Sequence, residues 1–167
     1  MTDPEPTIDT PKRAPEPPSS IPWPPLLLVI VTAAAIALAT LAPISWPGLD
    51  DLPARIVGLS IGAGGLALLV YSASTLMRAR TTILPHKPTD NLVTTGPYAR
   101  FRNPIYIADA MMLLGAAELF KNIWFVVGAA AFVILVTWLA ILPEERHLEA
   151  RFGEAYRAYK SRSRRWL

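Results

Sequence analysis

Three long apolar runs without a charged residue limit what this chain can fold into. A helix that crosses a bilayer needs about 20 mostly apolar residues, and each run is close to that length. Core helices of soluble proteins rarely continue so far without a polar face. Only 17% of the residues are charged, while 52% are hydrophobic. The three runs are residues 25–42, 56–77 and 122–143. We therefore expect an all-α integral membrane protein.

A fourth apolar stretch, residues 105–120, is shorter and contains Asp109 and Glu118. At roughly 1.5 Å per residue it would extend about 24 Å, less than the roughly 30 Å of a typical hydrocarbon core. It is therefore either a short span or one arm of a re-entrant hairpin, with Lys121 and Asn122 as the turn. We predict four membrane helices, of which the third is short and forms a hairpin with the fourth.

The lysine and arginine residues indicate how these helices are oriented. The loop at residues 43–53 contains neither, whereas residues 78–103 and the segment that begins at Glu144 contain many. Short basic loops next to membrane helices stay in the cytoplasm. We therefore expect both termini in the cytoplasm and the 43–53 loop on the other side of the membrane.

The two ends of the chain differ from the apolar helices between them. Residues 1–24 are rich in proline, acidic residues and serine, and they predict a disordered cytoplasmic tail without the pattern of a signal peptide. Towards the other end, apolar and aromatic side chains recur at helical spacing and predict an amphipathic helix at the cytoplasmic face. These side chains are Leu148, Phe152, Tyr156 and Tyr159. The chain thus divides into the tail, two membrane helices within residues 25–77, and a third part formed by residues 78–167.

Several kinds of site are excluded by the composition. The chain has no cysteine, which excludes disulfides, thiolate metal ligands and a cysteine nucleophile. His86 and His147 do not stand in metal-ligand spacing, so we predict no metal site. The basic loops lack the interleaved aromatic residues of a nucleic-acid-binding protein, so we predict no nucleic-acid partner. The glycines of residues 62–65 lie within an apolar run and indicate a close contact between helices.

The most polar sequence between the apolar runs is GPYARFRNPIY, residues 96–106. Its Gly-Pro pair predicts a turn, and Pro104 predicts the start of a helix. Non-helical backbone at membrane depth is tolerated only where it is buried in protein or lines a water-filled cavity. The start of the helix and two nearby arginines, Arg100 and Arg102, favour an anion-binding cavity. The alternative is that these are ordinary arginines beside a membrane helix.

Glu144 and Glu145 follow the last apolar run and form a second polar feature on the same predicted side of the membrane. A pair of carboxylates can hold an ammonium group through charge-assisted hydrogen bonds. Two acids at a membrane boundary can equally be solvated, so this pair alone does not distinguish a binding site from an ordinary surface.

Two segments together resemble the isoprenylcysteine carboxyl methyltransferase family. They are NLVTTGPYARFRNPIY (residues 91–106) and PEERHLEARFGEAYRAYK (residues 143–160), with an apolar hairpin between them. The resemblance covers the chain from Thr81 to Leu167. Members of this family are integral-membrane enzymes that use S-adenosyl-L-methionine, and they are related to the phospholipid methyltransferases. The chain resembles the bacterial-type members, which implies a place in the bacterial inner (plasma) membrane.

The resemblance also implies roles for individual residues. Glu144 would hold the ammonium group of S-adenosyl-L-methionine. The backbone that contacts the adenosyl part would be that of Asn91, Leu92 and Val93. The residues beside the methionine and sulfonium groups would be Tyr98, Asn103, Pro104 and Tyr106. On this assignment the catalytic residues are Tyr106 and Arg102.

The predicted reaction is methyl transfer to a carboxylate, thiol or amine of a small or lipophilic acceptor. An in-line displacement depends mainly on alignment, which agrees with the lack of a nucleophile motif. The residues before Glu144 are AILP, where eukaryotic members have a basic run that contacts the acceptor carboxylate, so the acceptor is left open. Two alternatives stay open as well: a non-catalytic membrane scaffold with the same fold, and an NADPH-dependent enzyme similar to the sterol reductases.

The predicted orientation can be tested by cysteine labelling, because the chain has no cysteine of its own. We expect a membrane-impermeant maleimide to label an Asp50→Cys variant in intact cells. A Lys160→Cys variant should be labelled only after the cells are permeabilised. Labelling of both variants from outside would contradict the predicted topology.

Overall fold

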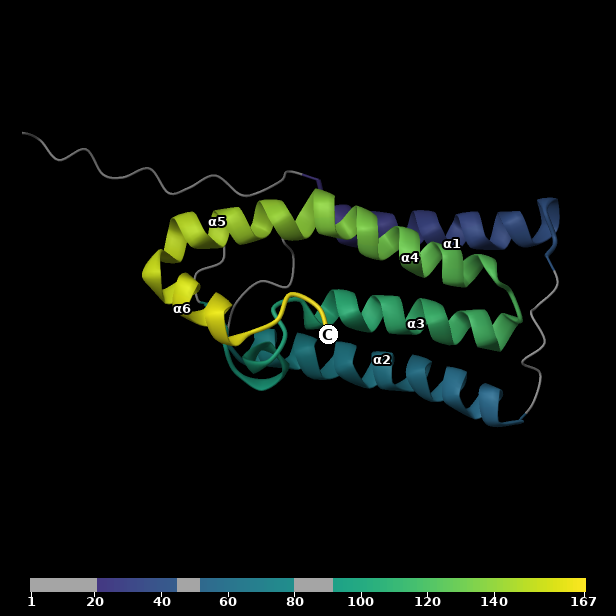
Figure 1. Ribbon diagram of the computed structural model, residues 1–167, viewed down its shortest axis with the longest axis horizontal. Coiled ribbons are helices and arrows are strands. Elements are labelled where there is room, and N and C mark those ends of the chain that lie inside the picture. The colour runs from purple at the N-terminus through teal and green to yellow at the C-terminus, as the bar shows by residue number, and fades with distance from the viewer. Residues whose placement is uncertain (1–20, 45–51, 80–91) are drawn as a thin grey trace, which may run out of the picture.

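The computed structural model describes residues 21–44, 52–79 and 92–167, and their regular secondary structure is helical (Figure 1). The first two helices are α1 (Trp23–Leu41) and α2 (Leu52–Arg78). The later elements are the 3₁₀ helix η1 (Gly96–Ala99), α3 (Pro104–Phe120), α4 (Trp124–Val136), the π-helical segment η2 (Thr137–Ile141), α5 (Leu142–Phe152) and α6 (Glu154–Arg162). Most of the predicted tail, most of the 43–53 loop and Asn91 lie outside the described residues. The all-α prediction is confirmed for the described part of the chain.

The four long helices lie side by side in the order α1, α4, α3, α2 (Figure 1). Tyr106, Leu113 and Ala117 recur along α3 at a spacing that puts them on one face, and they join α1 and α4 in the apolar core. The opposite face of α3, which includes Ala108 and Gly115, packs against α2. The core residues of α1 and α4 are Leu27, Val31, Ala35, Phe125, Ala129, Phe132 and Val136.

Three helices of the described residues are long and apolar enough to cross a membrane: α1, α2 and the continuous helix Trp124–Phe152. Their outward surfaces are apolar, since Val29, Val70 and Trp138 are 65%, 60% and 67% exposed. Lipid tails, rather than water, suit an apolar surface of this extent. The fourth predicted span is not confirmed, because α3 has only 17 residues and contains two buried acids.

The predicted turn between α3 and α4 is confirmed. Lys121 ends α3 in the left-handed conformation, with φ of 49°, and its N–H donates to the last carbonyls of the helix. The side-chain oxygen of Asn122 accepts a hydrogen bond from the N–H of Trp124 at 3.0 Å. Its amide donates to the carbonyl of Ala35 on α1 at 3.2 Å. One turn therefore connects three helices.

The structure corrects two predictions for the C-terminal part of the chain. The helix that contains the last apolar run does not end at Pro143 but continues to Phe152. Pro143 has no N–H to donate to the preceding turn of the helix. The π-helical turns of η2, just before Pro143, have a wider hydrogen-bond spacing, which lets the helix continue without that bond. The predicted amphipathic helix is not one helix, because Gly153, with φ of 52°, separates α5 from α6. Tyr156 and Tyr159 are consequently buried within the protein, so an amphipathic helix along the membrane surface is not confirmed.

Glycines let α2 and α3 pack closely, as the glycines of residues 62–65 predict. A Cβ added to Gly115 would lie 2.4 Å from the Cα of Gly62, and one added to Gly65 would lie 2.8 Å from the carbonyl oxygen of Ala108. Small residues allow such an approach, which strengthens van der Waals contact between helices in a membrane. The contact fixes α3, and with it Tyr106 near its start, against α2.

We expect Gly115→Ala to destabilise the protein, because the new methyl group would meet the backbone of Gly62. Overpacking of this kind typically costs about 1–3 kcal/mol. Gly64→Ala is the matched control, since the nearest atom to its Cβ is the flexible end of Met111 at 3.4 Å. Thermal denaturation in detergent should show a lower midpoint for Gly115→Ala alone. Equal midpoints would show that the two helices can separate without cost.

Candidate active site

The Gly-Pro turn predicted from the sequence is present and leads to a buried tyrosine. Gly96 has φ of 58°, and a Cβ there would lie 3.0 Å from Oγ1 of Thr75 on α2. Both its conformation and the space around it therefore favour glycine. Pro97 and Tyr98 are buried in η1. Pro104 begins α3, as its fixed φ and missing N–H predict.

Residues 163–167, here called the C-terminal strap, return from α6 to the start of α3 (Figure 1). The strap pairs with the polar turn through the backbone. The N–H of Arg102 donates to the carbonyl of Arg164 at 2.7 Å, and the N–H of Arg164 donates to the carbonyl of Arg100 at 2.8 Å. Trp166 packs against the apolar core. The strap thus covers the point at which the turn enters α3.

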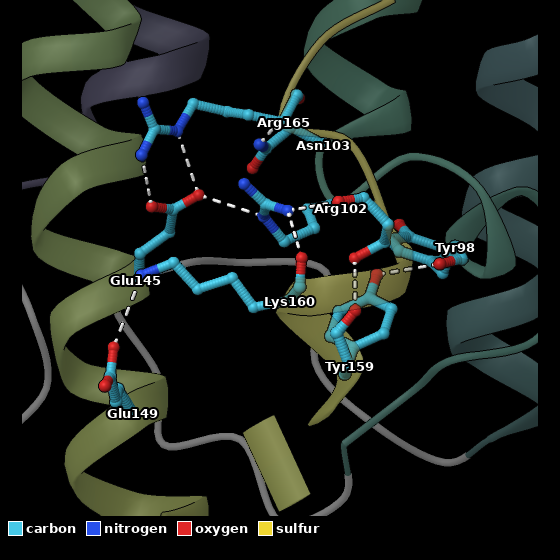
Figure 2. A network of polar contacts seen from close by, with 9 residues as sticks. Tyr98, Arg102, Asn103, Glu145, Glu149, Tyr159, Lys160 and Arg165 are labelled. Atoms are coloured by element: carbon cyan, nitrogen blue, oxygen red, sulfur yellow. Dashed lines mark hydrogen bonds and ion pairs between the residues drawn. The ribbon is translucent and has the colours of Figure 1, made fainter. Parts of the chain in front are cut away.

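A buried carboxylate, that of Glu145 on α5, joins the turn to the strap (Figure 2). Its Oε1 accepts hydrogen bonds from Nε of Arg102 at 3.1 Å and from Nε of Arg165 at 3.0 Å, and its Oε2 accepts one from Nη2 of Arg165 at 2.7 Å. Nη1 of Arg102 donates to the carbonyls of Lys160 and Ser163. The hydrogen bonds that Arg165 donates to Glu145 raise the pKa of Arg165, which therefore stays charged.

Buried tyrosines form the layer next to this ion-pair network. The hydroxyl of Tyr159 donates to the carbonyl of Tyr98 at 2.7 Å, which ties α6 to η1 (Figure 2). Burial raises the pKa of Tyr159 to about 12, and it also raises the pKa of Tyr98 and of Tyr156. All three phenols are therefore neutral at physiological pH, and each keeps a proton to donate.

Glu144 has a different environment from its neighbour in sequence. Its Oε2 accepts a hydrogen bond from the hydroxyl of Tyr106 at 3.4 Å, and no ion pair holds it among the described residues. Glu144 also lies close enough to Tyr98 to help raise the pKa of that phenol, after burial as the main cause. Glu145 is paired with two arginines, whereas the partner of Glu144 within the described part of the chain is the neutral phenol of Tyr106.

The start of α3 lies beside these groups and is not capped by a side chain. Asn103, the residue before the helix, has φ of −127° and ψ of 54° and makes no capping hydrogen bond. Its amide instead donates to the carbonyl of Arg165 in the strap, at 3.1 Å. A helix start without a side-chain cap leaves N–H groups and a positive dipole end for an anion.

The structure brings together five of the residues that the sequence predicts for the site: Tyr98, Asn103, Pro104, Tyr106 and Glu144. Leu92 and Val93 precede η1 as half-buried, non-helical residues, and Asn91 lies outside the described residues. Arg102 contacts Glu145 and two carbonyls rather than the Tyr106–Glu144 pair.

The part played by Arg165 and the strap was not predictable from the sequence. The only signal was the cluster of arginines at residues 162–165, whose charge alone is as compatible with a membrane-facing tail.

A pocket of about 590 Å³ lies at the other end of the bundle, beside the α3–α4 turn. It contains none of the predicted site residues, and its lining includes Pro43 and Ile44. It is therefore not a candidate site.

We expect Glu145→Ala to release the strap, because it leaves the buried guanidinium of Arg102 without a carboxylate. Breaking a buried pair in this way costs about 3–5 kcal/mol. Glu149→Ala, on the same helix, is the control and should have little effect, since its ion pairs with Arg157 and Lys160 are exposed to solvent. Amide hydrogen exchange at Arg102 and Arg164 should accelerate in the first variant only. Unchanged exchange would show that the backbone bonds hold the strap without Glu145.

Comparison with known proteins identifies the family to which the chain belongs. The family model described as phospholipid methyltransferase matches residues 53–155, from the start of α2 into α6. An uncharacterized protein from Haemophilus influenzae is 33% identical over 63 residues, which is 38% of this chain and the whole of that protein. No solved structure matches. Because the family model covers more than half of a chain that also has membrane-type helices, this is a membrane protein of the phospholipid methyltransferase family.

Proposed function

We propose that this protein transfers a methyl group from S-adenosyl-L-methionine to a lipophilic acceptor in the membrane. The family supports a methyltransferase, rather than the scaffold or the NADPH-dependent enzyme that the sequence left open. The observation that carries the proposal is the unequal use of two adjacent acids. Glu145 is paired with two arginines, whereas Glu144 is bound, among the residues that the structure describes, only by the phenol of Tyr106 beside the uncapped start of α3.

The residues present fit the charged groups of S-adenosyl-L-methionine. The carboxylate of Glu144 suits the ammonium group, and the start of α3 suits the carboxylate. The oxygens of Tyr98 and Tyr106 can face the sulfonium without adding a positive charge. When bound, the cofactor supplies an electrophilic methyl group. Leu92 and Val93, with Asn91, remain our proposal for the adenosyl contacts.

For Tyr106 we propose a direct part in alignment, because its hydroxyl is oriented by Glu144. Holding acceptor, methyl carbon and sulfur in line can supply most of the acceleration of such a displacement. For Arg102 we propose a supporting part in place of direct catalysis. Its guanidinium is used by Glu145 and by two carbonyls, so it positions the strap over the site.

The membrane setting indicates the class of the acceptor, a lipophilic molecule, but not its identity. A lipophilic molecule could reach the site sideways between helices, while the cofactor enters from water. The residues before Glu144 are apolar and offer no cation to an acceptor carboxylate, which counts against specificity of the isoprenylcysteine type. A place in the bacterial inner membrane with both termini in the cytoplasm remains part of the proposal.

We expect Glu144→Gln to weaken the binding of S-adenosylhomocysteine by about ten- to a hundredfold, because a charge-assisted hydrogen bond contributes roughly 1.5–3 kcal/mol. Tyr106→Phe should weaken binding less, since it removes only the hydroxyl that orients Glu144. Glu149→Gln, on the exposed side of the same helix, should bind as the wild type does. Isothermal titration of the purified variants with S-adenosylhomocysteine measures these differences. A separate titration with NADPH tests the alternative, reductase-like function. Unchanged affinity in Glu144→Gln would remove the main support for the proposal.

A further inference from the structure

The C-terminal strap and the polar turn beside it are rich in exposed arginines. Residues 92–103 and 163–167 contain no aspartate or glutamate. Three exposed arginines lie here, and we call them the basic surface. They are Arg100 in the turn, Arg162 at the end of α6, and Arg164 in the strap. The turn and the strap are joined at this surface, since the N–H of Arg164 donates to the carbonyl of Arg100 at 2.8 Å.

Within the part of the chain that the structure describes, no ion pair neutralises the basic surface. The carboxylate of Glu145 is bound by the two other arginines of the turn and the strap. The remaining acids on the outer side of α5 and α6, Glu149 and Glu154, are paired with Arg157 and Lys160. The positive charge of the basic surface is therefore available to an anionic partner.

Apolar side chains next to the basic surface indicate that it lies at the level of the lipid headgroups. Trp166 of the strap and Trp23 at the start of α1 both pack against the apolar core. Tryptophan is enriched at the boundary between hydrocarbon and water, because its ring is apolar and its N–H is polar. Leu167, directly after the strap tryptophan, is 81% exposed, and an exposed leucine beside arginines suits the same boundary.

The path of the strap connects the basic surface to the covering of the site. α5 and α6 extend beyond the start of α3, and the strap returns from the end of α6 to that start (Figure 1). Closing the strap therefore brings Arg164 back from the level of α6 to the end of the membrane bundle. An anionic lipid surface attracts an arginine more strongly at the shorter distance, so it favours the closed strap over an open one.

We propose that Arg100, Arg162 and Arg164 form a docking surface for the headgroups of anionic phospholipids, which hold the C-terminal strap closed over the start of α3. The partner is a membrane lipid, because the surface lies beside apolar side chains at the end of a bundle of membrane-type helices. The basic surface is separate from the Tyr106–Glu144 pair, so this inference does not depend on the proposed methyl transfer.

The test uses the full-length protein in vesicles of phosphatidylcholine, either alone or mixed with an equal amount of phosphatidylglycerol. Exchange of the amide hydrogens of Arg102 and Arg164 reports opening of the strap, because both N–H groups donate across the contact between turn and strap. We expect phosphatidylglycerol to slow this exchange by about fivefold for each docked arginine. High salt should remove the difference, since it screens exposed charges.

Two double variants remove the same amount of charge from the same end of the molecule. Arg100→Gln with Arg164→Gln removes it from the basic surface, and we expect exchange in the mixed vesicles to rise towards the rate in phosphatidylcholine. Arg157→Gln with Lys160→Gln is the matched control, because those cations are already paired with acids. Its exchange should stay slow in the mixed vesicles. Arg100→Lys with Arg164→Lys keeps the charge and should keep the effect.

A second measurement detects the lipid itself. The chain has no cysteine, so a fluorophore attached to a Leu167→Cys variant reports from the strap alone. Phosphatidylglycerol with a nitroxide near its headgroup should quench this fluorophore about fivefold more efficiently than phosphatidylcholine with the same nitroxide. The glutamine variant of the basic surface should lose that preference.

The results that overturn the inference differ for its two parts. Equal quenching by the two lipids, or an equal loss of amide protection in the two double-glutamine variants, overturns the docking surface. Preferential quenching by phosphatidylglycerol without slower amide exchange overturns the claim that the lipid holds the strap closed.

Discussion

The carboxylate of Glu145 joins three parts of the chain that are far apart in the sequence. It binds Arg102 in the polar turn and Arg165 in the strap, while it belongs itself to the helix that leaves the membrane bundle. A buried ion pair of this kind contributes little net stability, because desolvating the charges offsets their attraction. Its importance lies in what it excludes. Any other arrangement of the strap would leave a buried charge without a partner, so the strap has one place.

That constraint assigns different tasks to adjacent residues. Neighbouring side chains on an α-helix point about 100° apart, so Glu144 cannot share the partners of Glu145. It faces Tyr106 and the start of α3 instead. The cations are used in the same way, since Arg102 and Arg165 are paired with Glu145, while the start of α3 has no side-chain cap. Within the described residues, Glu144 and this helix start therefore lie side by side without an ion pair.

Local features of the sequence predicted local structure well. The long apolar runs predicted α1, α2 and α4, the Gly-Pro pair predicted the turn at Gly96, and Pro104 predicted the start of α3. These features act over a few residues through φ restriction, hydrogen-bond donors and apolar length. The close contact between α2 and α3 was also predictable, because glycines within an apolar helix allow the backbone of a second helix to approach.

What could not be predicted depends on contacts between distant residues. Nothing near Arg165 in the sequence indicates that its guanidinium reaches α5, and nothing near Glu145 distinguishes it from Glu144. The continuation of the last helix past Pro143 also depends on a rare local geometry rather than on propensity. Asp109 was visible in the sequence as a charge within an apolar stretch, but its burial is a property of the folded protein.

The π-helical segment η2 has a consequence for how this protein tolerates insertions and deletions. A π turn is equivalent to one extra residue in an α-helix, and η2 lies between the membrane half of its helix and the two adjacent acids. Loss of a single residue from Thr137–Ile141 would remove the bulge and restore regular α-helical spacing, with the helix on either side still in phase. Glu144 and Glu145 would then keep their neighbours. The same loss from the regular helix on either side would instead rotate all that follows by about 100°, so η2 is where this helix best tolerates a change in length.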